Sequence, residues 1–139
     1  MKDRKMYKKI IVSMALDHGF GPRALELARK LKSEDGKITA IHVFEPLRNP
    51  VSLYVPKEYL EKVRQSSIKE INSRIGDEKD VEGVVLKGSS GLVVTDYAKE
   101  VGADFIIVGS HKPGVKDYLL GSTAARIVRH AHCAVHVLR

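Results

Sequence analysis

The chain has 139 residues, 43% of them hydrophobic and 29% charged, which predicts one soluble globular domain over residues 1–139. Lys and Arg number 24 against 17 Asp and Glu, but the basic residues are spread out and no nucleic-acid signature accompanies them, so nucleic-acid binding is not expected. The first apolar run, IIVSMAL, is too short to span a bilayer, and no signal peptide is visible. We therefore expect a cytoplasmic protein with no membrane partner.

The first predicted elements are a strand and a helix. A basic leader over residues 1–6, which we expect to be disordered, precedes the nearly continuous apolar run KKIIVSMAL from residue 8. The helix that follows begins near Pro22 and ends before Gly36. Its apolar stripe consists of Ala24, Leu27, Ala28 and Leu31.

Strands and helices continue to alternate along the chain. KITAIHVFE from residue 37 predicts the second strand, and a Pro-bounded loop over 46–56 separates it from a helix. The stripe of that helix consists of Leu60, Val63, Ser67, Ile68, Ile71 and Ile75. VEGVVLKG from residue 81 and ADFIIVGS from residue 103 predict the third and fourth strands. The helix between them has a stripe of Val94, Tyr97, Ala98 and Val101.

The last predicted elements are a helix, with a stripe of Ala124, Ile127, Val128 and Ala131, and the strand CAVHVLR from residue 133. Runs that are apolar on both faces and separated by helices predict an α/β fold, with a parallel sheet covered on both sides. Right-handed crossovers give, most simply, a doubly wound five-stranded sheet in the order 3-2-1-4-5. A ligand is then expected where the order reverses, at the carboxyl ends of the first and fourth strands.

The loop GSHKPGVKDYLLGS, residues 109–122, leaves the fourth strand at that place. Its glycines allow the backbone to approach a ligand closely, and the first turn of the next helix offers unpaired N–H groups to an anion. His111 and Lys112 add basic side chains. We interpret the loop as a candidate phosphate cradle; the alternative is an ordinary strand-to-helix loop with a solvated basic face.

The same residues resemble a known family. GSH after the fourth strand, LLGS before the last helix and VRHAHCAVHVLR at the end together resemble the universal stress protein family, and most closely its enteric F and G type branch. The resemblance covers Tyr7 to Arg139. It implies a Rossmann-like, adenine nucleotide alpha hydrolase-like fold that binds ATP, ADP or AMP, with or without Mg²⁺. The family holds the phosphates with a Gly-x2-Gly-x9-Gly-Ser/Thr loop.

The chain departs from the family pattern in and near this loop. Gly109 and Gly121-Ser122 match it, whereas Lys112 stands at the second glycine and only eight residues separate it from Gly121. Lysine removes a close backbone approach but supplies a charge that can meet a phosphate. Ala15 stands where the family often has an aspartate at the end of the first strand. Asp17 either takes that role, caps the first helix or faces solvent.

Adenine is expected to be held by main-chain groups of Met14 to Leu16 and of Val43, with Met14 and Val108 as apolar walls. Ser122 is expected to cap the last helix and to turn its N–H group, with that of Thr123, towards a phosphate. The predicted site comprises Ser13, Met14, Ala15, Asp17, Val43, Val108, Gly109, His111, Lys112, Gly121, Ser122 and Thr123.

For several side chains of the loop 109–122 and of the C-terminal segment, a structural role is the alternative to ligand binding. His111 either contacts a phosphate or the ribose or closes its loop against Asp17, and Lys112 either meets a phosphate or is solvated. The potential zinc ligands His130, His132, Cys133 and His136 straddle a helix-to-strand boundary, so no metal site is expected. We expect Cys133 to be a small buried hydrophobe.

The expected function is an ATP- or adenine-nucleotide-binding module with a sensing or regulatory role in stress. We find no nucleophile and base, no Walker lysine and no acidic pair for magnesium, so we expect at most slow ATP hydrolysis. The alternative, favoured by Ala15 and Lys112, is a nucleotide-free interaction module that acts through oligomerisation. We expect a homodimer joined through the strand 133–139, or else a monomer whose edge is shielded by Arg139 and the leader.

Overall fold

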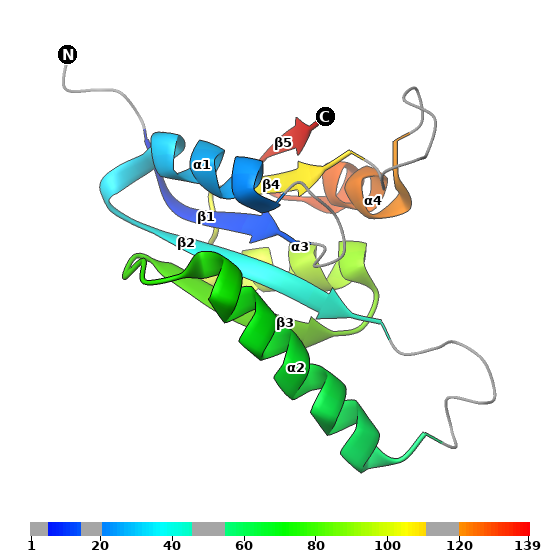
Figure 1. Ribbon diagram of the computed structural model, residues 1–139. Helices are drawn as coiled ribbons and strands as arrows, with labels where there is room; N and C mark the ends of the chain where they lie inside the picture. The colour runs from blue at the N-terminus through cyan, green and yellow to red at the C-terminus, as the bar shows by residue number, and fades with distance from the viewer. Residues whose placement is uncertain (1–5, 15–20, 46–54, 111–119) are drawn as a thin grey trace.

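Strands and helices alternate along the chain (Figure 1). The computed structural model describes residues 6–14, 21–45, 55–110 and 120–139. The strands are β1 (Tyr7–Ser13), β2 (Lys32–Phe44), β3 (Val81–Lys87), β4 (Phe105–Gly109) and β5 (Ala134–Leu138). The helices are α1 (Gly21–Leu31), α2 (Lys57–Ile75), α3 (Ser90–Val101) and α4 (Ser122–His130).

The strands form one parallel sheet in the order β3-β2-β1-β4-β5. This confirms the predicted fold class and strand order. β1 lies at the centre, with β2 on one side and β4 on the other. The direction of winding therefore reverses between β1 and β4, and the carboxyl ends of these two strands meet at one edge of the sheet.

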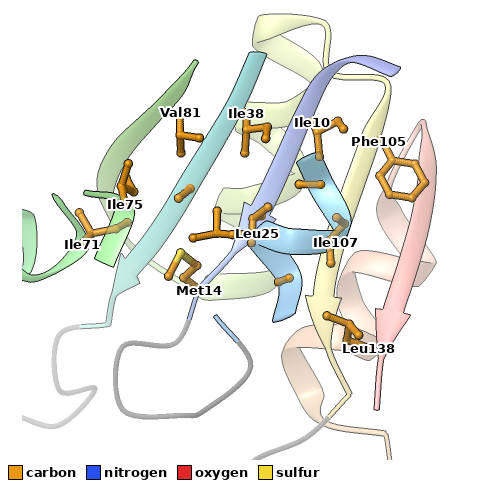
Figure 2. Packing of buried hydrophobic residues seen from close by; sticks show 14 residues of the cluster. Ile10, Met14, Leu25, Ile38, Ile71, Ile75, Val81, Phe105, Ile107 and Leu138 are labelled. Carbon is orange, nitrogen blue, oxygen red and sulfur yellow. The ribbon is translucent and has the colours of Figure 1, made fainter. Parts of the chain in front are cut away.

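Two hydrophobic clusters cover the two faces of the sheet. Figure 1 shows α1 and α2 on one face and α3 and α4 on the other. Ile10 and Val12 of β1 pack towards α1 and α2, whereas Ile11 packs towards α3 and α4. This alternation explains why the strand sequences are apolar at successive positions. Figure 2 shows the cluster on the α1 and α2 side, where Ile38 and Ile107 are completely buried.

The first helix ends earlier than the sequence predicts. α1 stops at Leu31 and β2 begins at the next residue, so Gly36 lies inside a strand. The register of β1 with β2 shifts between Tyr7 and Lys9. A Cβ at Gly36 would lie 2.9 Å from the Tyr7 carbonyl oxygen, so glycine is needed there for a close approach of two strands, not as a helix stop.

The apolar stripe of the last helix is narrower than predicted. Ala124 and Ile127 are buried, but Val128 is 51% exposed. α4 packs against α3 through the side that carries Arg126, and β5 is the edge of the sheet. Val128 lies on the opposite side of the helix, where no described element covers it. Cys133 is only partly buried, against the α3 and α4 cluster.

Candidate functional site

The carboxyl ends of the central strands lie together, where the sequence predicts a ligand. Ser13 at the end of β1 pairs with Val108 of β4, which ends at Gly109. Val43 of β2 packs in the same cluster as Val108, on the α3 and α4 side. Alternate residues of a strand share a face, so Ser13 faces this side with Ile11. The fold therefore brings these predicted site residues to one place.

The two Gly-Ser pairs of the loop meet at its base. The main-chain N–H of Gly121 donates a hydrogen bond of 2.6 Å to the carbonyl oxygen of Ser110, and the N–H of Ser110 donates to the Leu138 carbonyl at 2.7 Å. Ser110 is 2% exposed and was not among the predicted site residues, although it belongs to the same GSH motif. Ser110, just after β4, and Gly121, just before α4, are therefore hydrogen-bonded to each other.

Gly121, not Ser122, occupies the N-cap of α4. Gly121 has an extended backbone (φ −60°, ψ 154°), and its carbonyl oxygen accepts the first hydrogen bond of the helix from Ala125 at 2.9 Å. The expectation that Ser122 caps this helix was thus wrong by one position. Glycine has no side chain to offer, and no described side chain caps this terminus. The first-turn N–H groups of Ser122 and Thr123 therefore have no intrahelical acceptor.

The N-terminus of α3 lies beside that of α4 and has a different partner. The Glu45 carboxylate, just after β2, accepts hydrogen bonds from the Ser90 N–H and hydroxyl, both at 2.7 Å. The N–H of Gly88 donates to the Phe44 carbonyl at 3.0 Å, which holds the ends of β2 and β3 together. A fixed negative charge thus compensates the N-terminal dipole of α3.

An open cleft of ≈ 270 Å³ lies between these two helix ends. Its lining is polar and consists of Glu45, Ser89, Gly91, Ser122, Thr123 and Arg126. The Arg126 guanidinium donates a hydrogen bond of 2.7 Å to the Ser89 hydroxyl, across the cleft from α4 to the N-cap of α3. The cleft thus has donors on the α4 side and a carboxylate on the α3 side.

Sequence reasoning missed three side chains of this cleft: Glu45, Ser89 and Arg126. Glu45 and Ser89 follow β2 and β3 directly, so they lie at the same sheet edge as the predicted residues. Arg126 lies one helical turn after Ser122. Ser89 belongs to the GSS at 88–90, which resembles a family loop beside the pocket but lacks its proline, and Glu45 and Arg126 belong to no motif of the sequence.

Met14 is placed differently from the other predicted residues. Its side chain is buried in the α1 and α2 cluster, on the face of the sheet opposite the cleft (Figure 2). Its N–H donates to the Ile41 carbonyl at 2.7 Å, and its carbonyl oxygen lies 3.1 Å from Nδ1 of His42. The main-chain groups of Met14 are therefore used within the protein.

Four predicted site residues, Ala15, Asp17, His111 and Lys112, lie outside the described residues. In the part of the chain that the structure describes, no three His, Cys, Asp or Glu side chains are grouped so that they could hold a metal ion. No described helix is both long and apolar enough to cross a membrane.

The doubly wound sheet, with a polar cleft at the carboxyl ends of its strands, defines a Rossmann-like α/β protein. The sequence model of the universal stress protein family matches residues 6–139, and the chain belongs to this family. The resemblance given by the GSH, LLGS and C-terminal motifs is thereby confirmed.

Two relatives and one solved structure illustrate the match. The chain is 32% identical over 141 residues to universal stress protein A homolog 2 of Coxiella burnetii, covering 96% of this chain and 95% of the relative. It is 29% identical over 143 residues to universal stress protein G of Escherichia coli O157:H7, covering 96% and 100%. The structure of hypothetical protein MJ0577 superposes with a TM-score of 0.81 at 22% identity, covering 96% of each chain.

Other solved structures of this fold contain nucleotides. They are a universal stress protein with cAMP (TM-score 0.61, 18% identity, 97% of this chain and 98% of that one), the Archaeoglobus fulgidus protein with dAMP (0.63, 18%, 96% and 99%) and an Arabidopsis thaliana family protein with AMP (0.61, 20%, 94% and 90%). At these identities the comparisons establish the fold of this chain.

Proposed function

We propose that this chain is an adenine-nucleotide-binding module with a sensing or regulatory role in the stress response of the cytoplasm. ATP, ADP or AMP binds in the cleft between α3 and α4. The observation that carries the proposal is the N-terminus of α4, where Ser122 and Thr123, whose N–H groups have no intrahelical acceptor, line an open cleft beside Arg126. The nucleotides in neighbouring structures of the fold support the same ligand class.

The residues of the cleft suit a phosphate. Helix N-termini bind anions through first-turn N–H groups and the helix dipole, and the Gly121 cap of α4 has no side chain of its own that would occupy these groups. The Arg126 guanidinium carries five N–H donors, so it can bind a phosphate oxygen in addition to Ser89. In this proposal Lys112 and His111 add to the phosphate site, and Val43 and Val108 contact the base.

The proposal concerns binding and at most slow hydrolysis. Glu45 is the one carboxylate among the described residues that line the cleft. Its Oε1 is held by the N–H and hydroxyl of Ser90. A carboxylate fixed in this way is an acceptor that orients a ligand rather than a base that is free to activate water.

Native mass spectrometry of protein purified without added nucleotide tests the proposal, together with thermal unfolding in AMP, ADP and ATP with and without Mg²⁺. We expect a mass addition equal to one nucleotide, or a rise in the midpoint of unfolding that grows with nucleotide concentration. A bare polypeptide mass together with no thermal shift in any nucleotide would overturn the proposal and favour a nucleotide-free interaction module.

We further propose that the chain forms a homodimer through residues 133–139. β5 pairs with β4 on one side and is the edge of the sheet on the other. Val135 and Val137 are only partly buried, and Val128 of the preceding helix is exposed. An apolar edge strand exposes unpaired backbone groups, which an antiparallel copy of the same strand can satisfy about a twofold axis.

A further inference from the structure

His136 lies in the middle of β5, on the face of the sheet that α1 and α2 cover further in. Leu138, two residues on, belongs to the α1 and α2 cluster, and alternate residues of a strand share a face. The His136 ring lies 6.5 Å from the ring of Phe105, measured between centroids. α1 packs over β1, β2 and β4, and the imidazole on the edge strand is exposed.

The main-chain groups of β5 restrict how this strand can pair with a copy of itself. The N–H of Ser110 donates to the Leu138 carbonyl, so the main-chain groups of Leu138, and by alternation those of His136, point towards β4. Those of Val135 and Val137 point to the edge of the sheet. In an antiparallel pair of copies, the hydrogen bonds therefore come from these two valines, and His136 takes a non-hydrogen-bonded position.

One register of this pair uses the whole strand. A twofold axis at His136 sets Val135 opposite Val137 of the copy, and all five residues of β5, Ala134–Leu138, are paired. An axis at any other residue of the strand leaves two or more of the five unpaired in each copy. The complete register satisfies the most main-chain groups, and it sets each His136 directly opposite the other. The two Cβ atoms are then about 5 Å apart, as in other cross-strand pairs.

Two imidazoles at this separation can bind the same metal ion. Histidine is the commonest metal ligand in proteins, and its ring nitrogen binds Zn²⁺ at about 2.0–2.1 Å. Within one chain, the described residues contain no group of three side chains that could hold a metal, but the twofold axis brings a second histidine to the first. Ala134 and Leu138, which share the face with His136, carry no side-chain oxygen. The pair therefore suits Zn²⁺ or Cu²⁺, whereas Mg²⁺ and Ca²⁺ require oxygen ligands.

We propose that the homodimer binds one divalent transition-metal ion between its two His136 side chains, and that this ion stabilises the dimer. The inference rests on the proposed pairing of residues 133–139 and does not depend on the nucleotide cleft. The site is incomplete in one chain, so the ion binds the dimer in preference to the monomer. By mass action, a ligand of this kind shifts the equilibrium towards the dimer and makes assembly respond to the supply of metal.

Sedimentation equilibrium of the wild-type protein in EDTA, in zinc chloride and in magnesium chloride tests the inference. We expect Zn²⁺ at about ten times its own dissociation constant to lower the dissociation constant of the dimer about tenfold. Mg²⁺ should leave it unchanged. A dimer whose dissociation constant is the same in EDTA and in Zn²⁺ would overturn the inference and leave the homodimer intact. A protein that is monomeric in both would overturn the homodimer and the inference with it.

The substitution His136→Gln assigns the effect of zinc to this side chain. It removes the imidazole and keeps the main-chain groups of β5, so we expect a dimer that forms in EDTA and no longer responds to Zn²⁺. His132→Gln is the matched control, because His132 is also an exposed histidine but precedes the strand. This control should respond to Zn²⁺ as the wild type does. A response to Zn²⁺ that persists in His136→Gln would overturn the inference.

Discussion

The Arg126 guanidinium of α4 donates a 2.7 Å hydrogen bond to the hydroxyl of Ser89, the N-cap of α3. The two helices are in close contact at this level, because a Cβ at Gly91 would lie 2.5 Å from Cβ of Arg126. The first turns of α3 and α4 therefore border the cleft as one packed unit. Substitutions that push α3 and α4 apart should change both the free energy of unfolding and the shape of the cleft.

Gly91→Ala should lower the free energy of unfolding by about 1–2 kcal/mol. Alanine gains up to about 1 kcal/mol of helix propensity over glycine, but overpacking at a close contact costs about 1–3 kcal/mol. Leu92→Ala is the neighbouring control, since Leu92 is 44% exposed and its truncation should matter less. Urea unfolding measures both variants. A Gly91→Ala protein as stable as the wild type would show that the two helices separate at little cost.

Arg126→Gln should weaken nucleotide binding about tenfold or more, because it removes a charge-assisted hydrogen bond to the phosphate. The affinity should also depend less on salt in this variant than in the wild type. Titration with AMP at low and moderate ionic strength measures both effects. Arg129→Gln removes the same charge from the last turn of α4, away from the cleft, and should change the affinity little. Equal losses in the two variants would indicate a general charge effect in place of a phosphate contact.

The fold could be predicted because its signals are local. Residues 105–108 of β4 are all buried, and such a run indicates a strand covered on both faces wherever it stands in the chain. Gly36 was misinterpreted because its reason is not local. The pattern of a glycine after an apolar stripe is typical of a helix end, whereas the carbonyl that requires glycine there belongs to Tyr7.

The site could be predicted only in part, because local sequence patterns identify some of its residues and tertiary packing brings the others to it. Ser122 and Thr123 were found because a Gly-Ser pair before a helix is itself a signal for anion binding. Glu45, Ser89 and Arg126 are ordinary polar residues at the ends of different elements, and only the packing of α3 against α4 brings them together. The face that Met14 occupies was open to prediction, because Met14 follows the buried Val12 by two positions.

The Cys133 thiol should react slowly with iodoacetamide in the folded protein. Burial raises the pKa of this thiol, and the negative charge of Asp104 raises it further, so the reactive thiolate is scarcer than in an unfolded chain. Alkylation rates at pH 8, with and without urea, measure the difference. A folded protein that reacts as fast as the unfolded chain would contradict it.

The same shift in pKa has a consequence for stability. Because the folded state holds the thiol proton more tightly, this contribution to stability is present at neutral pH. It decreases as the pH rises above the ordinary thiol value of about 8.5. Unfolding midpoints are to be measured from about pH 7 to about pH 10, a range that brackets this pKa. With rising pH the midpoint should fall more steeply for the wild type than for Cys133→Ala. Parallel slopes for the two proteins would contradict this account.

Val135→Pro should convert the proposed dimer into a folded monomer. The Leu138 carbonyl accepts a hydrogen bond from β4 through Ser110, so the main-chain groups of Leu138 point towards β4. Successive residues of a strand alternate, and those of Val135 and Val137 therefore point outward, to the free edge. Proline at 135 removes an N–H that points away from β4 and towards the proposed partner strand, so it leaves the ladder with β4 intact.

Light scattering after gel filtration at micromolar concentration measures the assembly. The wild type should have twice the 15.4 kDa mass of one chain, and Val135→Pro should have the mass of one chain with an unchanged circular dichroism spectrum. His136→Pro is the contrasting variant, since its N–H points towards β4 and its loss should destabilise the fold itself. A monomeric wild type would overturn the proposed dimer. A Val135→Pro protein that stays folded and fully dimeric would show that the two chains meet through a different surface.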